Sequence, residues 1–188
     1  MGTTSTDSDG AAARLRYIQN FVHDHPVTGP AGHSYIPSES RPTAVHSPTP
    51  YRLTVLDHIS ASVDEIAEHT YAANPDAGPV PSQPAAVYDW CHQNTEHAPE
   101  ADRERLEAIE YRQYLEHAIR AGDDSVVCRH RCPTCRTWGL MWQQHLQRAV
   151  CTNSRCHDRA GAASKFTLAR LAFEHVATRK NLRQARAT

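Results

Sequence analysis

The stretch CPTCRTWGLMWQQHLQRAVCTNSRC, residues 132–156, carries two close pairs of cysteines. Two residues separate Cys132 from Cys135, four separate Cys151 from Cys156, and fifteen lie between the two pairs. Two such pairs on separate turns can place four thiolates at the corners of a tetrahedron, the geometry that Zn²⁺ takes in structural sites. The spacing therefore predicts a four-cysteine zinc site with Cys132, Cys135, Cys151 and Cys156 as ligands.

The residues between the two pairs predict a β-hairpin. Residues 137–142, TWGLMW, have the composition of a strand, residues 143–147 are polar and turn-like, and residues 148–150 lead back into the second pair. A hairpin held between two cysteine pairs is a zinc ribbon. Because four thiolates fill the coordination sphere, no position remains for a catalytic water, and the zinc is expected to be structural.

Alternatives to this ligand set remain open on sequence grounds. The four thiols could be unrelated, or a different set of four cysteines that includes Cys128 could hold an iron–sulfur cluster. His130, His145 and His157 lie near enough in sequence to replace a thiolate. Cys91 stands alone and is expected to be a small core residue. A disulfide framework is disfavoured because thiols stay reduced in the cytosol.

Composition limits the class of protein. Leu, Ile, Val and Phe make up only 16% of the 188 residues, a share too low for a single large core. No apolar run approaches the roughly 20 residues of a membrane span. The first ten residues have neither a basic start nor an apolar stretch, so no secretory signal is expected. We expect a soluble, cytoplasmic protein.

The remaining chain predicts a mostly α, α+β fold with a helical N-terminal half. Residues 1–10 are polar and expected to be disordered. Residues 11–23 predict a short helix, and residues 24–52, with six prolines, predict a linker. Residues 53–121 predict a helical domain that stops at Gly122. Its first helix has an apolar seam with spacings of three and four, made by Leu56, Ile59, Val63, Ile66, Thr70 and Ala73.

Residues 128–188 are expected to form the zinc ribbon with a basic C-terminal helix. Thr167 suits the position that caps the start of this helix, and the periodicity continues to about Ala185. The predicted apolar face consists of Leu168, Leu171, Ala172, Val176 and Leu182.

Charge divides the chain into two unlike halves. Residues 1–128 carry a net charge of −11 and residues 129–188 a net charge of +10. A basic half of this kind favours contact with a polyanion, either DNA or RNA. The candidate nucleic-acid-binding residues are Arg136, Arg148, Arg155, Arg179, Lys180, Arg183 and Arg186. Trp138 or Trp142 could stack on bases.

The rival interpretation is that the acidic half covers the basic half. The protein would then be a structural, scaffold or protein-interaction component, such as a phage assembly protein, in which zinc only stabilises the C-terminal half. Residues 53–121 could also mediate self-association or bind a protein partner. A free basic face favours the nucleic-acid interpretation, and a covered one favours the scaffold.

Catalytic motifs are not found in the sequence. The chain lacks GxxxxGK[ST], GxGxxG, GxSxG and HExxH, which mark phosphate, dinucleotide, acyl-transfer and zinc-hydrolase chemistry. We therefore expect a non-enzymatic adaptor or regulatory protein.

The segments CPTCRTWGLMW, RAVCTNSRC and FTLARLA resemble small uncharacterised zinc-ribbon proteins of actinobacteria and their phages, prophages and plasmids. The resemblance covers roughly residues 50–188. It implies a helical N-terminal half, a C-terminal zinc ribbon followed by a helix, and the four cysteines of the two pairs as ligands. It also implies a mobile-element origin, but it supplies no activity.

Overall fold

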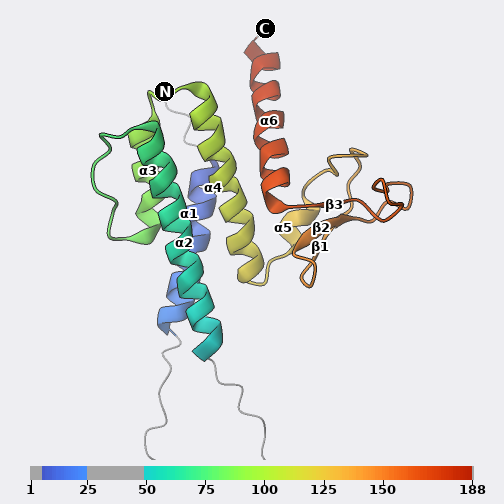
Figure 1. Ribbon diagram of the computed structural model, residues 1–188, viewed down its shortest axis with the longest axis horizontal. Coiled ribbons are helices and arrows are strands. Elements are labelled where there is room, and N and C mark those ends of the chain that lie inside the picture. Colours follow the sequence, from blue (N-terminus) through green and yellow to red (C-terminus); the bar gives the residue numbers. More distant parts are fainter. Residues whose placement is uncertain (1–5, 25–48, 188) are drawn as a thin grey trace, which may run out of the picture.

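The computed structural model describes residues 6–24 and 49–187, and it places a helical bundle beside a small antiparallel sheet (Figure 1). This arrangement confirms the expected class, mostly helical with a small sheet and a C-terminal helix. The elements in chain order are α1 (Thr6–Asp24), α2 (Thr49–Ala73), a 3₁₀ turn (Pro84–Ala86), α3 (Val87–Thr95), α4 (Glu100–Arg120), α5 (Ser125–Cys128), β1 (Leu140–Gln143), β2 (Arg148–Cys151), β3 (Lys165–Phe166) and α6 (Leu168–Ala187).

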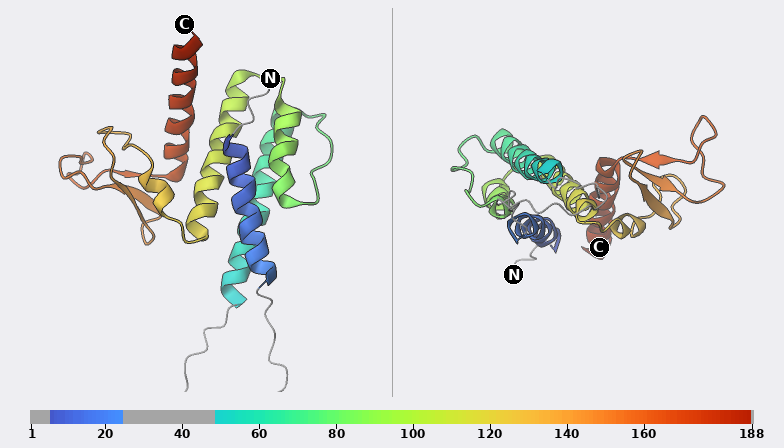
Figure 2. Two further views of the ribbon diagram at one scale, coloured as in Figure 1. Left: turned by 180° about the vertical axis from the view of Figure 1, so that it is seen from behind. Right: turned by 90° about the horizontal axis from the view of Figure 1, so that it is seen from below.

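The N-terminal helix is longer than the sequence suggested. It begins at Thr6, so residues 6–10, expected to be disordered, are helical. Residues 49–52, assigned to the linker, belong to α2. The rest of the predicted linker, residues 25–48, and residues 1–5 lie outside the described residues. α1 packs chiefly on α4 and so belongs to the helical bundle (Figure 2).

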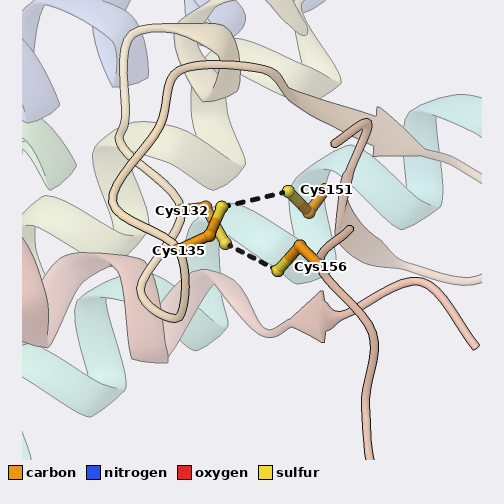
Figure 3. A group of neighbouring side chains, drawn as sticks. All are labelled: Cys132, Cys135, Cys151 and Cys156. Carbon is orange, nitrogen blue, oxygen red and sulfur yellow. Dashed lines mark hydrogen bonds between the residues drawn. The ribbon is translucent and has the colours of Figure 1, made fainter. Parts of the chain in front are cut away.

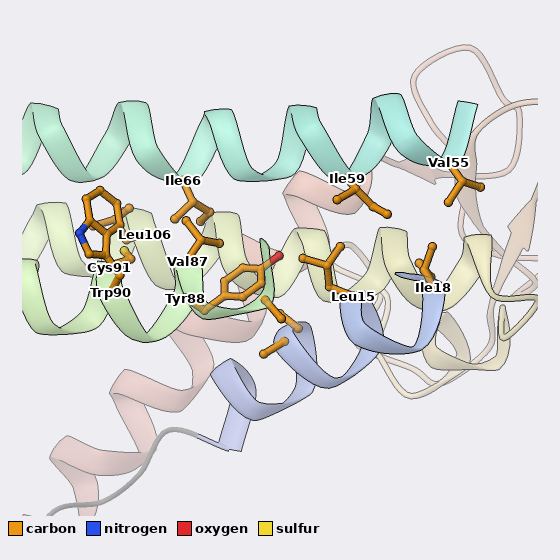
Figure 4. Packing of buried hydrophobic residues seen from close by; sticks show 13 residues of the cluster. Leu15, Ile18, Val55, Ile59, Ile66, Val87, Tyr88, Trp90, Cys91 and Leu106 are labelled. Carbon is orange, nitrogen blue, oxygen red and sulfur yellow. The ribbon is translucent and has the colours of Figure 1, made fainter. Parts of the chain in front are cut away.

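A first hydrophobic core joins α1, α2, α3 and α4 (Figure 4). Leu15 of α1, Ile59 and Ile66 of α2, Val87 of α3 and Leu106 of α4 are all buried. The isoleucines of the predicted seam are thus covered within the chain. Across the described residues, no helix combines the length and apolarity needed to cross a membrane.

The predicted seam of α2 is wrong at its first position. Leu56 is 47% exposed and its neighbour Val55 is buried instead. Further along, Ser62 is buried, and Val63 is half-buried and packs against the first core as expected. The later seam residues Ile59, Ile66 and Thr70 are buried as predicted. The side chain of Gln113 on α4 donates to the Ser62 carbonyl (3.1 Å).

Gln113 is one end of a buried hydrogen-bond chain that crosses the bundle. The Tyr88 hydroxyl donates to Gln113 Oε1 (2.8 Å) and lies 3.0 Å from His117 Nε2. His117 Nδ1 lies 2.8 Å from His58 Nε2. Since the tyrosine proton points to Gln113, His117 Nε2–H must donate to the tyrosine oxygen, and neutral His117 accepts from His58. The chain thus runs in one direction, from His58 to Gln113.

A second core lies on the other side of α4. Leu115 and Ala118 of α4 pack with the buried residues of α5, the sheet and α6. α4 therefore serves both cores and joins the two halves of the protein. The helix stops at Gly122, as predicted. Gly122 has a φ of 85°, and the N–H of the next residue, Asp123, donates to the Ala118 carbonyl (2.8 Å).

The C-terminal helix packs against α4 (Figures 1 and 2). The Thr167 hydroxyl accepts from the Arg170 N–H (3.1 Å), which confirms the predicted cap. Four residues of the predicted apolar face are buried, namely Leu168, Leu171, Ala172 and Val176. The fifth, Leu182, is 56% exposed, because this end of α6 extends beyond the bundle (Figure 1).

Candidate metal centre

The four cysteines of the two pairs come together at the end of the sheet where β1 begins and β2 ends (Figure 3). Their sulfur atoms all lie within 4.8 Å of one another. Sγ of Cys132 is 3.7 Å from that of Cys156, and Sγ of Cys135 is 3.7 Å from that of Cys151. Thiolates around zinc at about 2.3 Å stand about 3.8 Å apart, whereas a disulfide needs about 2.05 Å. The four free thiols are therefore arranged to bind a metal ion.

Backbone hydrogen bonds hold the first pair on a tight turn. The Cys132 N–H donates to the Thr137 carbonyl (2.9 Å) and the Arg136 N–H to the Cys132 carbonyl (2.9 Å). Arg136 takes the left-handed conformation, with a φ of 60°, which closes the turn. The Thr137 hydroxyl lies 3.0 Å from Cys135 Sγ and is the main group that lowers the pKa of this thiol, to about 6.

The second pair is held by a strand that the sequence did not reveal. β3 pairs with β2, so the sheet has the order β1-β2-β3 and is not a simple hairpin. Ser164, just before β3, accepts from the Cys151 N–H (3.0 Å) and donates its N–H to the Cys156 carbonyl (3.2 Å). Its hydroxyl is 3.3 Å from Cys156 Sγ. With only two residues, β3 is too short for a recognisable alternation.

The hairpin itself is shorter than predicted. β1 begins at Leu140 and not at Thr137, and it pairs in register with β2 from Leu140↔Cys151 to Gln143↔Arg148. Gly139 interrupts the expected strand with a φ of 122°. Its carbonyl accepts from both the N–H (2.9 Å) and the hydroxyl (2.8 Å) of Thr152.

The other candidate ligands lie outside the cluster. Cys128 is exposed at the end of α5, and Cys91 is buried in the first core, as a small core residue would be. His130 is buried, with Nε2 3.2 Å from the Tyr111 hydroxyl, and His145 and His157 are exposed. Among the described residues, the only side chains found grouped for a metal are the four paired cysteines.

The predicted nucleic-acid-binding residues differ in their exposure and in their partners. Lys180 pairs with Glu100 (3.0 Å) and Glu104 on α4, so the acidic half covers this part of α6. Arg136 pairs with Glu174 of α6 (3.1 Å). Arg179 is half-buried and interacts with another group of the protein. The remaining four, Arg148, Arg155, Arg183 and Arg186, are exposed.

The two ribbon tryptophans have different surroundings. Trp138 is 58% exposed, and the Arg131 guanidinium lies 4.8 Å from its ring centroid, within range of a cation–π contact. Trp142 is half-buried and donates its indole N–H to Gln144 (2.8 Å). Of the two rings, Trp138 has the accessibility that stacking on a base requires.

Comparisons of the chain with protein-family models, with curated proteins and with solved structures gave no match.

Proposed function

We propose that the protein is a zinc-stabilised, non-enzymatic adaptor or regulator that binds nucleic acid through its C-terminal half. The observation that carries the proposal is the combination of a closed four-thiol site with exposed arginines in the same C-terminal half, namely Arg148, Arg155, Arg183 and Arg186. Zinc is favoured over other metals because four thiolates in a tetrahedral arrangement are typical of structural zinc. Bound zinc would contribute folding free energy, about 10–16 kcal/mol apparent in small zinc modules.

Metal analysis of purified variants tests the zinc assignment. Cys135→Ser removes one of the four ligands, and we expect this variant to lose stoichiometric zinc and the folded C-terminal half. Cys128→Ser is the matched control, because this thiol is exposed and outside the cluster. Zinc retained at one equivalent by Cys135→Ser, or iron in place of zinc in the wild-type protein, would overturn the assignment.

Charge and exposure support nucleic acid as the partner. The segment 129–188 carries +10, which falls to about +8 once zinc and four thiolates are counted. Arg155 lies on the turn of the second cysteine pair, and Arg183 and Arg186 lie on the free end of α6. Guanidinium groups bind phosphates through a planar fork of donors. Trp138 adds an aromatic surface near the first cysteine pair.

A salt titration against labelled single-stranded and double-stranded DNA and RNA tests this partner. Replacing Arg155, Arg183 and Arg186 by Ala should weaken binding and flatten the plot of log K against log salt by about 2 units, because each lost phosphate contact removes about 0.7–0.9. The matched control replaces three exposed arginines of the helical bundle, Arg16, Arg103 and Arg105. Equal slopes for the two triple variants would exclude these C-terminal arginines from the binding surface.

A scaffold function is the second candidate, and the pairing of Lys180 with Glu100 and Glu104 favours it. These contacts attach the basic helix to the acidic bundle, as a purely structural C-terminal half would require. Absence of binding to every nucleic acid at about 50 mM salt would make this candidate the better one.

A further inference from the structure

A cleft of about 630 Å³ lies where the helical bundle meets the ribbon. One wall is the C-terminal half of α4, the second is the turn between β1 and β2, and the third is the start of α6. Three arginines line it, Arg112 and Arg120 from α4 and Arg148 from β2. The acidic half of the chain thus supplies two of the three cations. The net charges of the two halves of the sequence did not indicate this.

Helical spacing places the two α4 arginines on one face, and ion pairs hold Arg112. Arg112, Glu116 and Arg120 are four residues apart, so they lie on one face of the helix. Arg112 is held by Glu65 and by Glu116 (3.0 Å). Glu116 is the one carboxylate among the cleft-lining residues that the structure describes. The three arginines outnumber the two carboxylates, Glu116 in the lining and Glu65 paired with Arg112, so a smaller positive excess remains.

The ribbon side of the cleft adds a third guanidinium and neutral donors. Arg148 is exposed, and its Nη1 donates to the neighbouring Gln147 carbonyl (2.8 Å), which orients the guanidinium. Gln144 and Gln147 of the same turn also line the cleft. Cations and amide donors converging from separate elements are the groups that bind an oxyanion.

The field of the α4 arginines already reaches a neighbouring buried group. Burial and then the positive charges of Arg120 and Arg112 lower the pKa of His58 to about 4. The start of α6 faces the same cleft at Thr167 and Ala169, and the positive end of a helix dipole adds to the attraction for an anion.

We propose that this cleft binds a phosphate group of the nucleic acid, with Arg120 and Arg148 as the contacting side chains. The inference rests on the function proposed above and deepens it. It places the strand across the junction of the two halves, so that the helical bundle takes part in binding. A free phosphate or pyrophosphate has the same chemistry and is the alternative source of the ligand.

The test uses the full-length, zinc-loaded protein and the double variant Arg120→Ala/Arg148→Ala. Its matched control is Arg103→Ala/Arg105→Ala, which removes the same charge from exposed positions of α4 outside this cleft. Binding of a labelled oligonucleotide is titrated with salt, and binding of pyrophosphate is followed by calorimetry. Zinc content and circular dichroism confirm that each variant is folded.

We expect the cleft variant to bind the oligonucleotide at least tenfold more weakly at low salt, with the salt slope reduced by about 1.5 units, and the control to change little. Arg120→Lys/Arg148→Lys should restore the slope but not all of the affinity, since lysine keeps the charge and loses the fork. A cleft variant that behaves like the control, while the Arg155/Arg183/Arg186 variant is weakened, would overturn the cleft and leave the proposed function intact. Pyrophosphate binding that depends on the cleft, without any oligonucleotide binding, would overturn the nucleic-acid function instead.

Discussion

Single backbone conformations determine the shape of the ribbon. Gly139 has a φ of 122°, and a Cβ at this position would lie 2.6 Å from the Thr152 hydroxyl oxygen. Arg136 accepts a φ of 60° in spite of its side chain, because the first cysteine pair requires a closed turn there. Glycine is thus needed at residue 139 for two separate reasons, its dihedral angle and the space around it.

Gly139→Ala should therefore destabilise the ribbon more than an ordinary substitution of a left-handed glycine. Gly161→Ala is the control, since Gly161 also has a positive φ (79°) but has nothing within 4 Å of the added Cβ. We expect the dihedral angle to lower the free energy of unfolding of both variants by about 1–2 kcal/mol. The close contact should lower that of Gly139→Ala by about 1–3 kcal/mol more. Urea unfolding followed by tryptophan fluorescence measures the difference, and equal losses would contradict it.

At the scale of the elements, the buried hydrogen-bond chain joins α2, α3 and α4 through neutral histidines. Burial is the main cause that lowers the pKa of His58 to about 4 and that of His117 to about 3. His58 contributes to the shift of His117, and Arg120 and Arg112 contribute to both shifts. The unfolded chain titrates near 6.5. The folded state thus binds fewer protons than the unfolded state between these values, so its stability falls as the pH drops from about 6.5 towards 3.

His58→Gln should make the helical bundle less sensitive to acid, because glutamine keeps a donor for His117 without titrating. Between pH 6.5 and 4, we expect the free energy of unfolding of the wild-type protein to fall by about 2 kcal/mol more than that of the variant. The control is His97→Gln, at an exposed position of the same bundle. Denaturant titrations at several pH values give the comparison, and parallel curves for the wild-type protein and His58→Gln would refute the assignment.

The elements with strong local signals were predicted from the sequence, and those defined by distant partners were not. The cysteine pairs, the stop at Gly122 and the cap at Thr167 are local, and the structure confirms all three. The hydrogen bond from Gln113 to the Ser62 carbonyl joins residues fifty-one apart, which no local pattern indicates. β3 has two residues and is defined by its pairing with β2.

The charge pattern of the sequence was likewise insufficient to identify the residues of the candidate binding surface. The sequence identified a basic half, but it did not show that Lys180 contacts glutamates of α4 or that Arg112 and Arg120 face the ribbon. Ion pairs form between surfaces that meet only in the folded chain. A division of charge along a sequence therefore does not identify which basic residues are available for contact with a partner.

At the scale of the whole molecule, two cores share one helix. The first core is built without any residue of the ribbon, whereas the second contains three of the four clustered cysteines. Removal of the metal should therefore destabilise only the half of the protein that contains the second core. We expect chelation to unfold the sheet and release α6 while α1 to α4 stay helical, with only partial loss of the circular dichroism signal.

Amide hydrogen exchange locates this effect. After chelation, amides of β1 and β2 should exchange rapidly, and those of α2 and the first half of α4 should stay protected. Restoring one equivalent of zinc should recover protection in the sheet. Loss of protection in α2 together with the sheet would mean that the two cores unfold as a single unit.

The packing of α1 on α4 has a consequence for the order of synthesis. About 75 residues separate the end of α1 at Asp24 from the start of α4 at Glu100. At roughly 5–20 residues per second, α1 leaves the ribosome about 4–15 seconds before its main partner exists. During that interval Leu15 and Ile18 have no α4 surface to cover them. The apolar face of α1 therefore lacks its main partner until the middle third of the chain has been translated.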